Sequence, residues 1–392
     1  MYRQIKIKKG RERSFINRHP WVFSGALDAV PDYGNGEIVE VVTSTGDIIG
    51  YGFFSPGSQI ICRIFEFTCE RIDDFPREFF RQKIFRAAEL RAIFIDRNST
   101  DCFRLVHAEG DFFPGLIVDV YRNIAVIQAL VKGVELLLDD IADALASLGY
   151  GKVFVKNSGA NRVEGVSMLD YVIRGDVGDD IEVRENSLKF MVDIAGGQKT
   201  GFFLDQRENR ELVKTLSTGR RVLNAFCYTG GFSVYALAGK AESIHSVDIS
   251  APAVAMTDEN IRLNFGSTDR GVTVRADCFE YLRGMEKDFF DMVILDPPAF
   301  VKHASGIEKG ARGYKDINLN AMRRIKKDSL LLTFSCSQHV SQDLFRKIIF
   351  GAAADAGRNI RVLKQLSQGA DHPVSIFHPE GEYLKGLLLH VE

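Results

Sequence analysis

The feature that most constrains the fold is a regular alternation of apolar segments and amphipathic helices in the second half of the chain. Beyond about residue 183, apolar runs of strand length are separated by stretches whose apolar residues recur at helical spacing. The expected strands cover residues 221–225, 243–248, 272–275, 291–295, 330–335, 360–366 and 383–391. Seven strands with helical connections predict one large α/β domain with a doubly wound sheet.

The first half of the chain has a different pattern. Short strands separated by glycine turns are expected at residues 36–42, 47–54 and 58–67, followed by a helix over residues 76–96. Further strands at 103–107, 116–121 and 124–130 and a helix at 134–148 predict an α+β block. A Gly/Asp-rich stretch at 175–180 suggests its end. We therefore expect three domains: an all-β domain at 1–70, an α+β domain at 71–183 and the α/β domain at 184–392, which suits 392 residues.

Charge is concentrated at the start of the chain. The whole sequence has a net charge of −2, but its first 25 residues carry seven basic side chains against Glu12 alone. The basic residues are Arg3, Lys6, Lys8, Lys9, Arg11, Arg13 and Arg18. Such a patch can hold a phosphate backbone, and a solvated charged strand is the alternative.

Other compositional signals argue against membrane, secreted and metal-binding proteins. No apolar run approaches the roughly 20 residues of a membrane span, and no secretory signal follows the basic start. The six cysteines form no CxxC pair, and the eight histidines show no HxxxH spacing. We expect a cytoplasmic protein without a disulfide framework, a membrane anchor or a bound metal.

The residues that follow the first two strands of the α/β domain suggest a nucleoside site. Ligands of an open α/β sheet gather at the carboxyl ends of its strands. The first strand leads into the turn 226–231, which contains Gly230 and Gly231, and the second ends at Asp248, eighteen residues after Gly230. This interval suits an acidic side chain that binds a ribose. Because the turn lacks G-x-G-x-x-G, we expect a nucleoside without a pyrophosphate.

The next two strand ends add groups that suit bases. Asp277 precedes Cys278 and Phe279, a carboxylate beside an aromatic ring. The fourth strand ends in the sequence Asp-Pro-Pro-Ala-Phe at 296–300, where two prolines remove N–H donors and expose carbonyls beside a carboxylate. This loop can hold an extruded base. Each feature alone has an ordinary reading as a turn, a helix cap or a rigid loop, but all four occur in order at successive strand ends.

Longer motifs resemble a known family. They are Gln-Lys-Thr-Gly-Phe-Phe-Leu-Asp-Gln-Arg at 198–207, Tyr-Thr-Gly-Gly-Phe at 228–232, Asp-Pro-Pro-Ala-Phe at 296–300, Arg-Gly-Tyr-Lys-Asp-Ile-Asn at 312–318 and Phe-Ser-Cys-Ser at 334–337. Together they closely resemble the bacterial ribosomal large subunit methyltransferase I family. Its members are class I, Rossmann-like S-adenosylmethionine enzymes that form 5-methylcytosine in 23S ribosomal RNA.

The resemblance covers the whole chain. The segment His-Pro-Trp-Val-Phe-Ser-Gly at 19–25 resembles a PUA-type RNA-binding domain, and the middle block resembles the linking α+β domain of the family. The resemblance thus implies a class I methyltransferase domain preceded by a PUA-like domain and an α+β domain, with S-adenosylmethionine as cofactor and RNA as partner.

The resemblance also implies a set of cofactor-binding residues. Asp248 would bind the ribose, Asp277 and Cys278 would flank the adenine, residues 226–230 would surround the methionine part, and residues 199–207 would close over it. The set comprises Lys199, Phe203, Asp205, Arg207, Phe226, Tyr228, Thr229, Gly230, Asp248, Asp277 and Cys278. Asp205 has an alternative role as a helix N-cap with Glu208. Asn224 stands where many class I enzymes have an acidic residue.

Carbon 5 of cytosine is a weak nucleophile until a thiolate adds to carbon 6. Cys336, just past the fifth strand, is the expected nucleophile, and Asp296 would bind the cytosine and stabilise developing charge. Because a free thiol has a pKa near ~8.5, a cation or helix N-terminus is expected nearby, and a helix is predicted to start near Ser341. Cys227 and Cys278 are interpreted as packing or binding residues.

Substrate contacts are expected from two segments. Pro297, Pro298 and Phe300 would hold the base. Arg312, Tyr314, Lys315 and Asp316 follow a Gly/Lys-rich loop and would become ordered on RNA binding. Lys302 and Lys309 are either phosphate contacts or ordinary surface charge. The base that removes the carbon 5 proton is either His339 or water.

Two rival functions stay open. Asp-Pro-Pro-aromatic loops also serve methyl transfer to nitrogens of adenine and guanine, which requires no cysteine. An inactive methyltransferase domain on an RNA-binding protein is the second rival. The sequence does not set the methylated nucleotide or the oligomeric state, for which a homodimer stays open.

Overall fold

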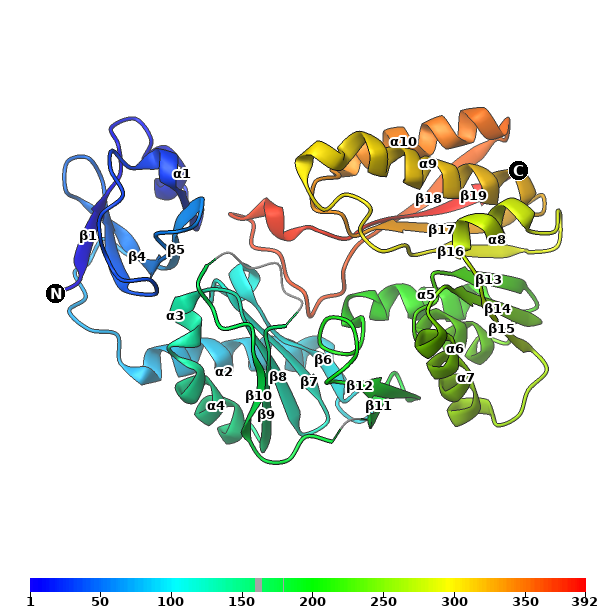
Figure 1. Cartoon of the computed structure of the whole chain (residues 1–392), viewed down its shortest axis with the longest axis horizontal. Coiled ribbons are helices and arrows are strands. Elements are labelled where there is room, and N and C mark those ends of the chain that lie inside the picture. The colour runs from blue at the N-terminus through cyan, green and yellow to red at the C-terminus, as the bar shows by residue number, and fades with distance from the viewer. Residues whose placement is uncertain (159–163, 179) are drawn as a thin grey trace. The chain divides into compact units, whose positions relative to one another are not determined.

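The computed structural model describes residues 1–158, 164–178 and 180–392 (Figure 1). Residue 179, within the stretch expected to end the middle domain, lies outside the described residues. Two compact units are present. The first comprises Met1–Val183, Val192–Leu204 and Ala370–Gly381, and the second comprises Arg184–Met191, Asp205–Gly369 and Glu382–Glu392. The chain therefore passes between the units five times.

The first unit begins with a five-stranded sheet in the order β1-β3-β4-β5-β2. Its strands are β1 (Arg3–Lys6), β2 (Trp21–Phe23), β3 (Ile38–Val42), β4 (Ile48–Phe54) and β5 (Ile60–Phe67). Strand β1 runs parallel to β3, and the other pairs are antiparallel. The short helix α1 (Arg13–Ile16) buries Phe15 in the core of this sheet, between Val22, Val39 and Ile61 among others. The all-β character expected of this segment is confirmed.

A second five-stranded sheet, in the order β10-β9-β8-β7-β6, completes the first unit. Its strands are β6 (Cys102–His107), β7 (Leu116–Tyr121), β8 (Ile124–Ala129), β9 (Lys152–Lys156) and β10 (Asp170–Arg174). Its helices are α2 (Arg77–Phe94), α3 (Lys132–Glu135) and α4 (Leu138–Ser147). The helix expected at 134–148 is thus two helices. Strands β9 and β10, which carry lysine, arginine and aspartate, were not anticipated from the apolar pattern.

Two segments from later in the chain are held on this sheet by buried polar contacts. Lys156 donates from Nζ to the carbonyl oxygens of Ile194 and Gly197, both at 2.6 Å. Arg91, on α2, pairs with Asp111 and donates to the carbonyl oxygen of Asp371 at 2.8 Å. Buried charges are stable only when paired in this way, so these contacts explain why 192–204 and 370–381 belong to the first unit.

The second unit is built on a seven-stranded sheet in the order β15-β14-β13-β16-β17-β19-β18. Its strands are β13 (Arg221–Ala225), β14 (Ser243–Asp248), β15 (Gly271–Arg275), β16 (Met292–Leu295), β17 (Ser329–Ser335), β18 (Ile360–Leu366) and β19 (Lys385–Val391). Its helices are α5 (Arg207–Leu216), α6 (Gly231–Ala238), α7 (Ala251–Phe265), α8 (Cys278–Gly284), α9 (Ile307–Arg324) and α10 (Gln342–Ala356). The doubly wound α/β fold predicted from the sequence is confirmed.

Strand direction places the site within this sheet. Strands β13 to β17 run parallel to one another, and β19 runs antiparallel between β17 and β18. The carboxyl ends of β13, β14, β15, β16 and β17 therefore lie along one edge. The start of the antiparallel β19, at Lys385, lies at the same edge because it pairs with Ser335 at the end of β17.

The remaining strands, β11 (Asp180–Glu185) and β12 (Leu188–Asp193), form a two-stranded sheet that includes the first two passages of the chain between the units. No helix in the described ranges is long and apolar enough to cross a bilayer.

Candidate active site

The turn that follows β13 has an unusual backbone. Phe226 and Tyr228 adopt positive φ angles of 62° and 48°, and Gly230 has a φ of 80°. Positive φ is costly for residues with a side chain, so the surrounding contacts must hold these two aromatics in place. A Cβ atom on Gly230 would lie 2.6 Å from Cγ2 of Thr257. The turn is therefore a tight cradle that depends on glycine at its last position.

Asp248, at the end of β14, fixes this turn. Its Oδ2 accepts a hydrogen bond from the backbone N–H of Tyr228 at 3.0 Å, and its Oδ1 accepts one from Ser250 at 2.9 Å. The carboxylate is half-buried, so each oxygen keeps the capacity for a further donor such as a hydroxyl group.

Two buried polar atoms beside the turn have no hydrogen-bond partner among the described residues. They are Oγ1 of Thr229, within the turn, and Oδ1 of Asn224, at the end of β13. The amide nitrogen of Asn224 donates to Ser233 at 2.9 Å, so its side chain is held in one orientation. An unpaired buried polar atom costs roughly 1–3 kcal/mol. A ligand with hydrogen-bonding groups at this turn would remove that cost.

The third strand end holds a helix cap and a buried thiol. Asp277 is exposed and caps α8, its Oδ1 accepting from the N–H groups of Phe279 at 2.8 Å and Glu280 at 3.1 Å. The Sγ atom of Cys278 accepts from the N–H of Phe226 at 3.2 Å. Burial raises the pKa of Cys278 to about 12 and that of Cys227 to about 12, so both thiols are protonated near neutral pH.

A line of aromatic rings joins this region to the Asp-Pro-Pro loop after β16. The ring centroids of Phe226 and Phe279 lie 6.1 Å apart, those of Phe279 and Phe300 lie 5.6 Å apart, and those of Phe300 and Tyr314 lie 4.6 Å apart. Such pairs are favourable beyond their buried area. They brace the loop that carries Asp296 with a continuous row of aromatic rings.

The segment with Arg312, Tyr314 and Lys315 differs from the expected ordering loop. It lies within the 18-residue helix α9, so it is regular structure without RNA. Tyr314 is fully buried, and its hydroxyl contacts Oγ of Ser337 at 2.8 Å. Arg312 pairs with Glu308, and Lys315 with Asp355 at 2.7 Å. Tyr314 therefore packs in the interior against the segment that follows β17, whereas Arg312 is exposed.

Cys336 lies directly after β17 and is half-buried. The other cysteines are either buried, at positions 62, 102, 227 and 278, or exposed, at 69. The Oγ atom of the next residue, Ser337, shares a hydrogen bond with the hydroxyl of Tyr314. It also accepts a hydrogen bond from the N–H of Val301 at 3.1 Å. Ser337 thus ties the Cys336 segment to the end of the Asp-Pro-Pro loop.

Two predicted features flank this cysteine. Ser341 is the N-cap of α10, as expected, and accepts from the N–H of Leu344 at 3.1 Å. His339 is exposed on the intervening turn.

Lys385, at the start of β19, was missed by the sequence reasoning. It is 2% exposed, and its Nζ donates to the carbonyl oxygens of Ser337 and Tyr383, both at 2.7 Å. Burial lowers the pKa of Lys385 to about 8, against the opposing effects of Cys336 and Glu382. Only the antiparallel pairing of Ser335 with Lys385 brings it here, and no local pattern predicts that pairing.

The segment expected to close over the cofactor is divided between the units. Lys199 and Phe203 belong to the first unit, where Nζ of Lys199 lies 4.3 Å from the centroid of the Phe203 ring. Asp205 and Arg207 belong to the second unit and are buried. Oδ2 of Asp205 accepts from the hydroxyl of Tyr383 at 2.6 Å. Helix α5 has Gln206 as its N-cap, so the alternative reading of Asp205 as the cap is wrong.

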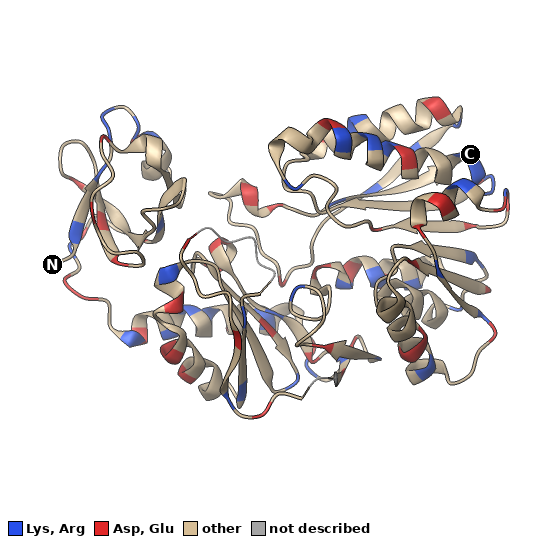
Figure 2. Ribbon diagram, in the orientation of Figure 1, with Lys and Arg blue, Asp and Glu red and all other residues tan. Residues whose placement is uncertain are grey.

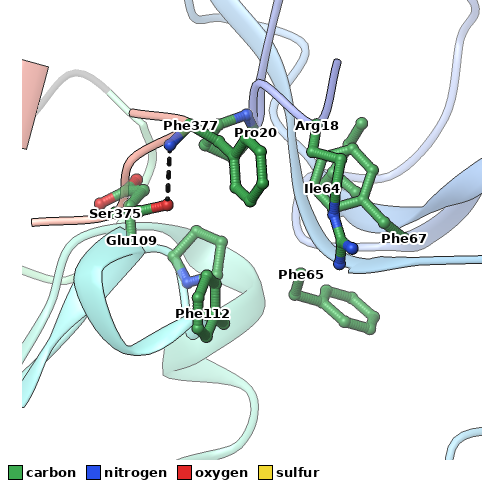
Figure 3. A pocket seen from close by; sticks show the side chains of 10 residues that line it. Arg18, Pro20, Ile64, Phe65, Phe67, Glu109, Phe112, Ser375 and Phe377 are labelled. Atoms are coloured by element: carbon green, nitrogen blue, oxygen red, sulfur yellow. Dashed lines mark hydrogen bonds between the residues drawn. The ribbon is translucent and has the colours of Figure 1, made fainter. Parts of the chain in front are cut away.

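The first unit contains a separate pocket with an aromatic rim (Figure 3). Its cavity of about 30 Å³ has room for a water molecule but not for a nucleobase. The guanidinium of Arg18 lies 5.5 Å from the ring centroids of both Phe67 and Phe377. Phe377 and Phe112 are 40% and 58% exposed. The rim therefore exposes two aromatic rings beside a cation.

Arg18 is one of seven basic residues near the N-terminus of the same unit. Figure 2 shows Lys and Arg along β1 and around α1. Of the seven basic residues near the N-terminus, all except Lys8 are exposed. Among the described residues no cluster of histidine, cysteine or acidic groups could hold a metal.

Comparisons with known proteins cover the whole chain. A family model described as an S-adenosylmethionine-dependent methyltransferase matches residues 110–326, and one described as a PUA-like domain matches residues 5–67. A protein named ribosomal RNA large subunit methyltransferase I from Pseudoalteromonas atlantica is 39% identical over 397 residues, covering 100% of both chains. A protein of the same name from Tolumonas auensis is 40% identical, covering 98% of both chains.

Solved structures show the same fold. A putative S-adenosylmethionine-dependent methyltransferase from Streptococcus mutans is 20% identical with a TM-score of 0.84, covering 99% of this chain and 100% of that one. A putative methyltransferase complexed with SAH is 20% identical with a TM-score of 0.86 over the same shares.

Proposed function

The chain belongs to the ribosomal RNA large subunit methyltransferase I family of S-adenosylmethionine-dependent enzymes, and on that premise we propose that it methylates carbon 5 of a cytosine in 23S ribosomal RNA. The observation that supports the cytosine assignment is the position of Cys336. It is the half-buried thiol at the end of β17, joined through Ser337 to the loop that carries Asp296. Methylation of a base nitrogen would need no thiol at this position.

The residues after β13, β14 and β15 fit S-adenosylmethionine. Asp248 would accept hydrogen bonds from the ribose hydroxyls, and the unpaired Oγ1 of Thr229 would bind the methionine part. Phe279 offers a ring face beside the exposed Asp277, which suits an adenine and its amino group. Lys199, Phe203, Asp205 and Arg207 complete the proposed cofactor set. Asn224 contributes an amide where a carboxylate would bind the methionine amine.

The chemistry of Cys336 begins with addition of its thiolate to carbon 6 of the cytosine. The new carbon–sulfur bond moves the electron pair of the ring double bond to carbon 5, which becomes nucleophilic. S-adenosylmethionine supplies the methyl group that carbon 5 then takes. A base removes the proton from carbon 5, the double bond re-forms, and the thiolate leaves carbon 6. The enzyme recovers its thiolate, and the ring gains one methyl group in place of one hydrogen.

Other groups hold the base during these steps. Asp296 would hydrogen-bond the cytosine edge and offset charge that develops on the ring, while Pro297, Pro298 and Phe300 shape its slot. His339 and water are both retained as acceptors of the carbon 5 proton. Because His339 is exposed on its turn, it would have to act at the mouth of the site.

The first unit would bind the RNA outside the reacting base. The exposed basic residues before residue 19 can contact phosphates, and the ring faces of Phe112 and Phe377 can stack on unpaired bases. Arg312, Lys302 and Lys309 would add phosphate contacts from the second unit. The PUA-like match at residues 5–67 supports a role of the first unit in binding RNA.

The test compares single cysteine variants on ribosomal RNA from a strain that lacks the modification. Cys336→Ser should form no 5-methylcytosine by mass spectrometry, whereas the exposed-site control Cys69→Ser should retain wild-type turnover. With RNA that contains 5-fluorocytosine, the wild type should form a covalent adduct on Cys336, because fluorine at carbon 5 cannot leave as a proton does. Methyl label on guanine or adenine, or full activity of Cys336→Ser, would overturn the proposal.

A further inference from the structure

The nucleophile needs a source of positive charge. A thiol with an ordinary pKa near ~8.5 is only a few per cent ionised at neutral pH, and partial burial makes ionisation harder still. Helix α10 begins at Gln342, six residues after Cys336, beyond the single turn over which a helix dipole acts strongly. A closer cation is required if Cys336 is to react as a thiolate.

Lys385 is a cation that the fold places next to the Cys336 segment. Strand β19 pairs with β17 so that Lys385 lies opposite Ser335, the residue before Cys336. Its side chain extends past the end of β17 and donates to the carbonyl oxygen of Ser337, the residue after Cys336, at 2.7 Å. The backbone of Lys385 is therefore fixed opposite the residue before the cysteine, and its ammonium group is fixed on the residue after it.

The site also explains why a lysine is buried there. An amino group that is 2% exposed would ordinarily be replaced by an apolar side chain, because burial of a charge is costly. Two carbonyl oxygens, of Ser337 and Tyr383, take two of its three N–H bonds at 2.7 Å. One N–H bond is left for a further acceptor.

We propose that the Lys385 ammonium is the counter-ion of the Cys336 thiolate and stabilises the ionised form of the nucleophile. This inference rests on the role of Cys336 proposed above. The other titratable groups around the pair are Tyr314 on α9, Glu382 just before β19 and Tyr383. Tyr314 stays neutral, because burial raises the pKa of its hydroxyl. Glu382 is exposed and favours the charged form of Lys385.

The pair has a predictable response to pH. Since burial lowers the pKa of Lys385 to about 8, the ammonium is present at neutral pH and is lost as the pH rises above that value. The thiolate is therefore stabilised most in the range where an isolated thiol would be protonated. An opposite charge at contact distance typically shifts a pKa by about 1–3 units.

The test measures the ionisation of Cys336 without RNA or cofactor. The rate of iodoacetamide alkylation is followed against pH, and the modified peptide is identified by mass spectrometry. The midpoint is the pH at which the alkylation rate reaches half its maximum. In the wild type, the midpoint for Cys336 should lie below that for Cys69, the exposed cysteine that serves as an internal reference. An equal or higher midpoint for Cys336 would overturn the inference, and this comparison needs no variant.

Substitutions then separate charge from hydrogen bonding. Lys385→Gln keeps an N–H donor but no charge, and it should raise the midpoint for Cys336 by about one unit or more. Lys385→Arg keeps the charge and should leave the midpoint low. If Gln and Arg raise it equally, Lys385 has only a structural role. The ascending limb of kcat/KM against pH should move upward by the same amount in Lys385→Gln.

The outcomes of the two proposals are distinguishable. A low midpoint that depends on Lys385, together with full methylation by Cys336→Ser, would remove the proposed reaction but keep the ion pair. A 5-methylcytosine product that requires Cys336, together with an alkylation midpoint that does not change in the Lys385 variants, would keep the proposed reaction but remove the ion pair.

Discussion

At the scale of single residues, the turn after β13 has positive φ angles at two aromatic residues as well as at Gly230. Phe226 and Tyr228 have positive φ, which costs on the order of 1–3 kcal/mol for each residue. The contacts that offset this cost are the bond from Phe226 N–H to Cys278 and the bond from Tyr228 N–H to Asp248. Asp248 therefore shapes the turn in addition to its proposed contact with the ribose.

This dual role predicts a large effect of Asp248→Asn on cofactor binding. The amide carries no charge and accepts through one oxygen only, so both the turn and the proposed ribose contact are weakened. We expect the Kd for S-adenosylmethionine, measured by titration calorimetry, to rise by about 10- to 100-fold, the equivalent of one charged hydrogen bond. Asp258→Asn, at an exposed position on α7, should leave the Kd unchanged. An unchanged Kd for Asp248→Asn would exclude the ribose role.

Residues that act through distant contacts were the ones that sequence reasoning missed. Asp248, Asp296 and Cys336 were proposed because each ends or directly follows a strand, and strand ends can be located from the apolar pattern. Lys385 lies 49 residues after Cys336 and meets it only through the pairing of β17 with β19. The sequence predicted that a cation or a helix N-terminus would lie near Cys336, but no local pattern pointed to Lys385.

At the scale of elements, helix α9 shows why a glycine-rich segment was mistaken for a loop. Gly310 and Gly313 lie within the helix, where glycine costs roughly 0.5–1 kcal/mol relative to alanine. A Cβ atom on Gly310 would lie 2.2 Å from Cγ2 of Val301, and one on Gly313 would lie 3.2 Å from the Phe300 ring. The glycines therefore let α9 approach the end of the Asp-Pro-Pro loop, a requirement that local propensity does not reveal.

Gly310→Ala should consequently displace the loop while it favours the helix. We expect kcat for RNA methylation to fall by about tenfold or more, since small misplacements of reacting groups are costly, while the Kd for S-adenosylmethionine changes little. Gly306→Ala is the matched control, because a Cβ atom at Gly306 would meet nothing within 4 Å. Equal effects of the two substitutions on kcat would show that close packing of α9 is not needed.

Most strands of the second unit were predicted, and the reason is burial. Strands β13, β16 and β17 are covered on both faces, so they read as continuous apolar runs that no other element explains. Strand β1, at the edge of the first sheet, carries mostly exposed polar residues, and its sequence does not distinguish it from a loop. The division of the chain into domains at residues 70 and 183 stays a prediction.

At the scale of the whole molecule, charge separates the two proposed tasks. The basic start of the chain belongs to the first unit, whereas the proposed chemistry belongs to the second. Binding through phosphates depends on released counter-ions, so it weakens as salt is added. Binding through stacked bases does not.

Neutralising three exposed residues near the N-terminus should change that salt dependence. For Lys9→Gln, Arg11→Gln and Arg13→Gln combined, the slope of log affinity for RNA against log salt should fall by about two, given roughly 0.7 for each phosphate contact with single strands. Lys287→Gln should leave the slope unchanged, because Lys287 is exposed before β16, at the opposite edge of the sheet from the site. Filter binding across salt concentrations provides the measurement, and an unaltered slope for the triple variant would assign RNA contact to other residues.

The five passages of the chain between the units also govern how the protein is made. Residues 370–381 belong to the first unit although they are among the last to be synthesised. Domains commonly fold as they leave the ribosome, amino-terminal part first. Here the first unit lacks its last segment until residue 381 has been synthesised. A nascent chain stalled before that residue would therefore contain two incomplete units.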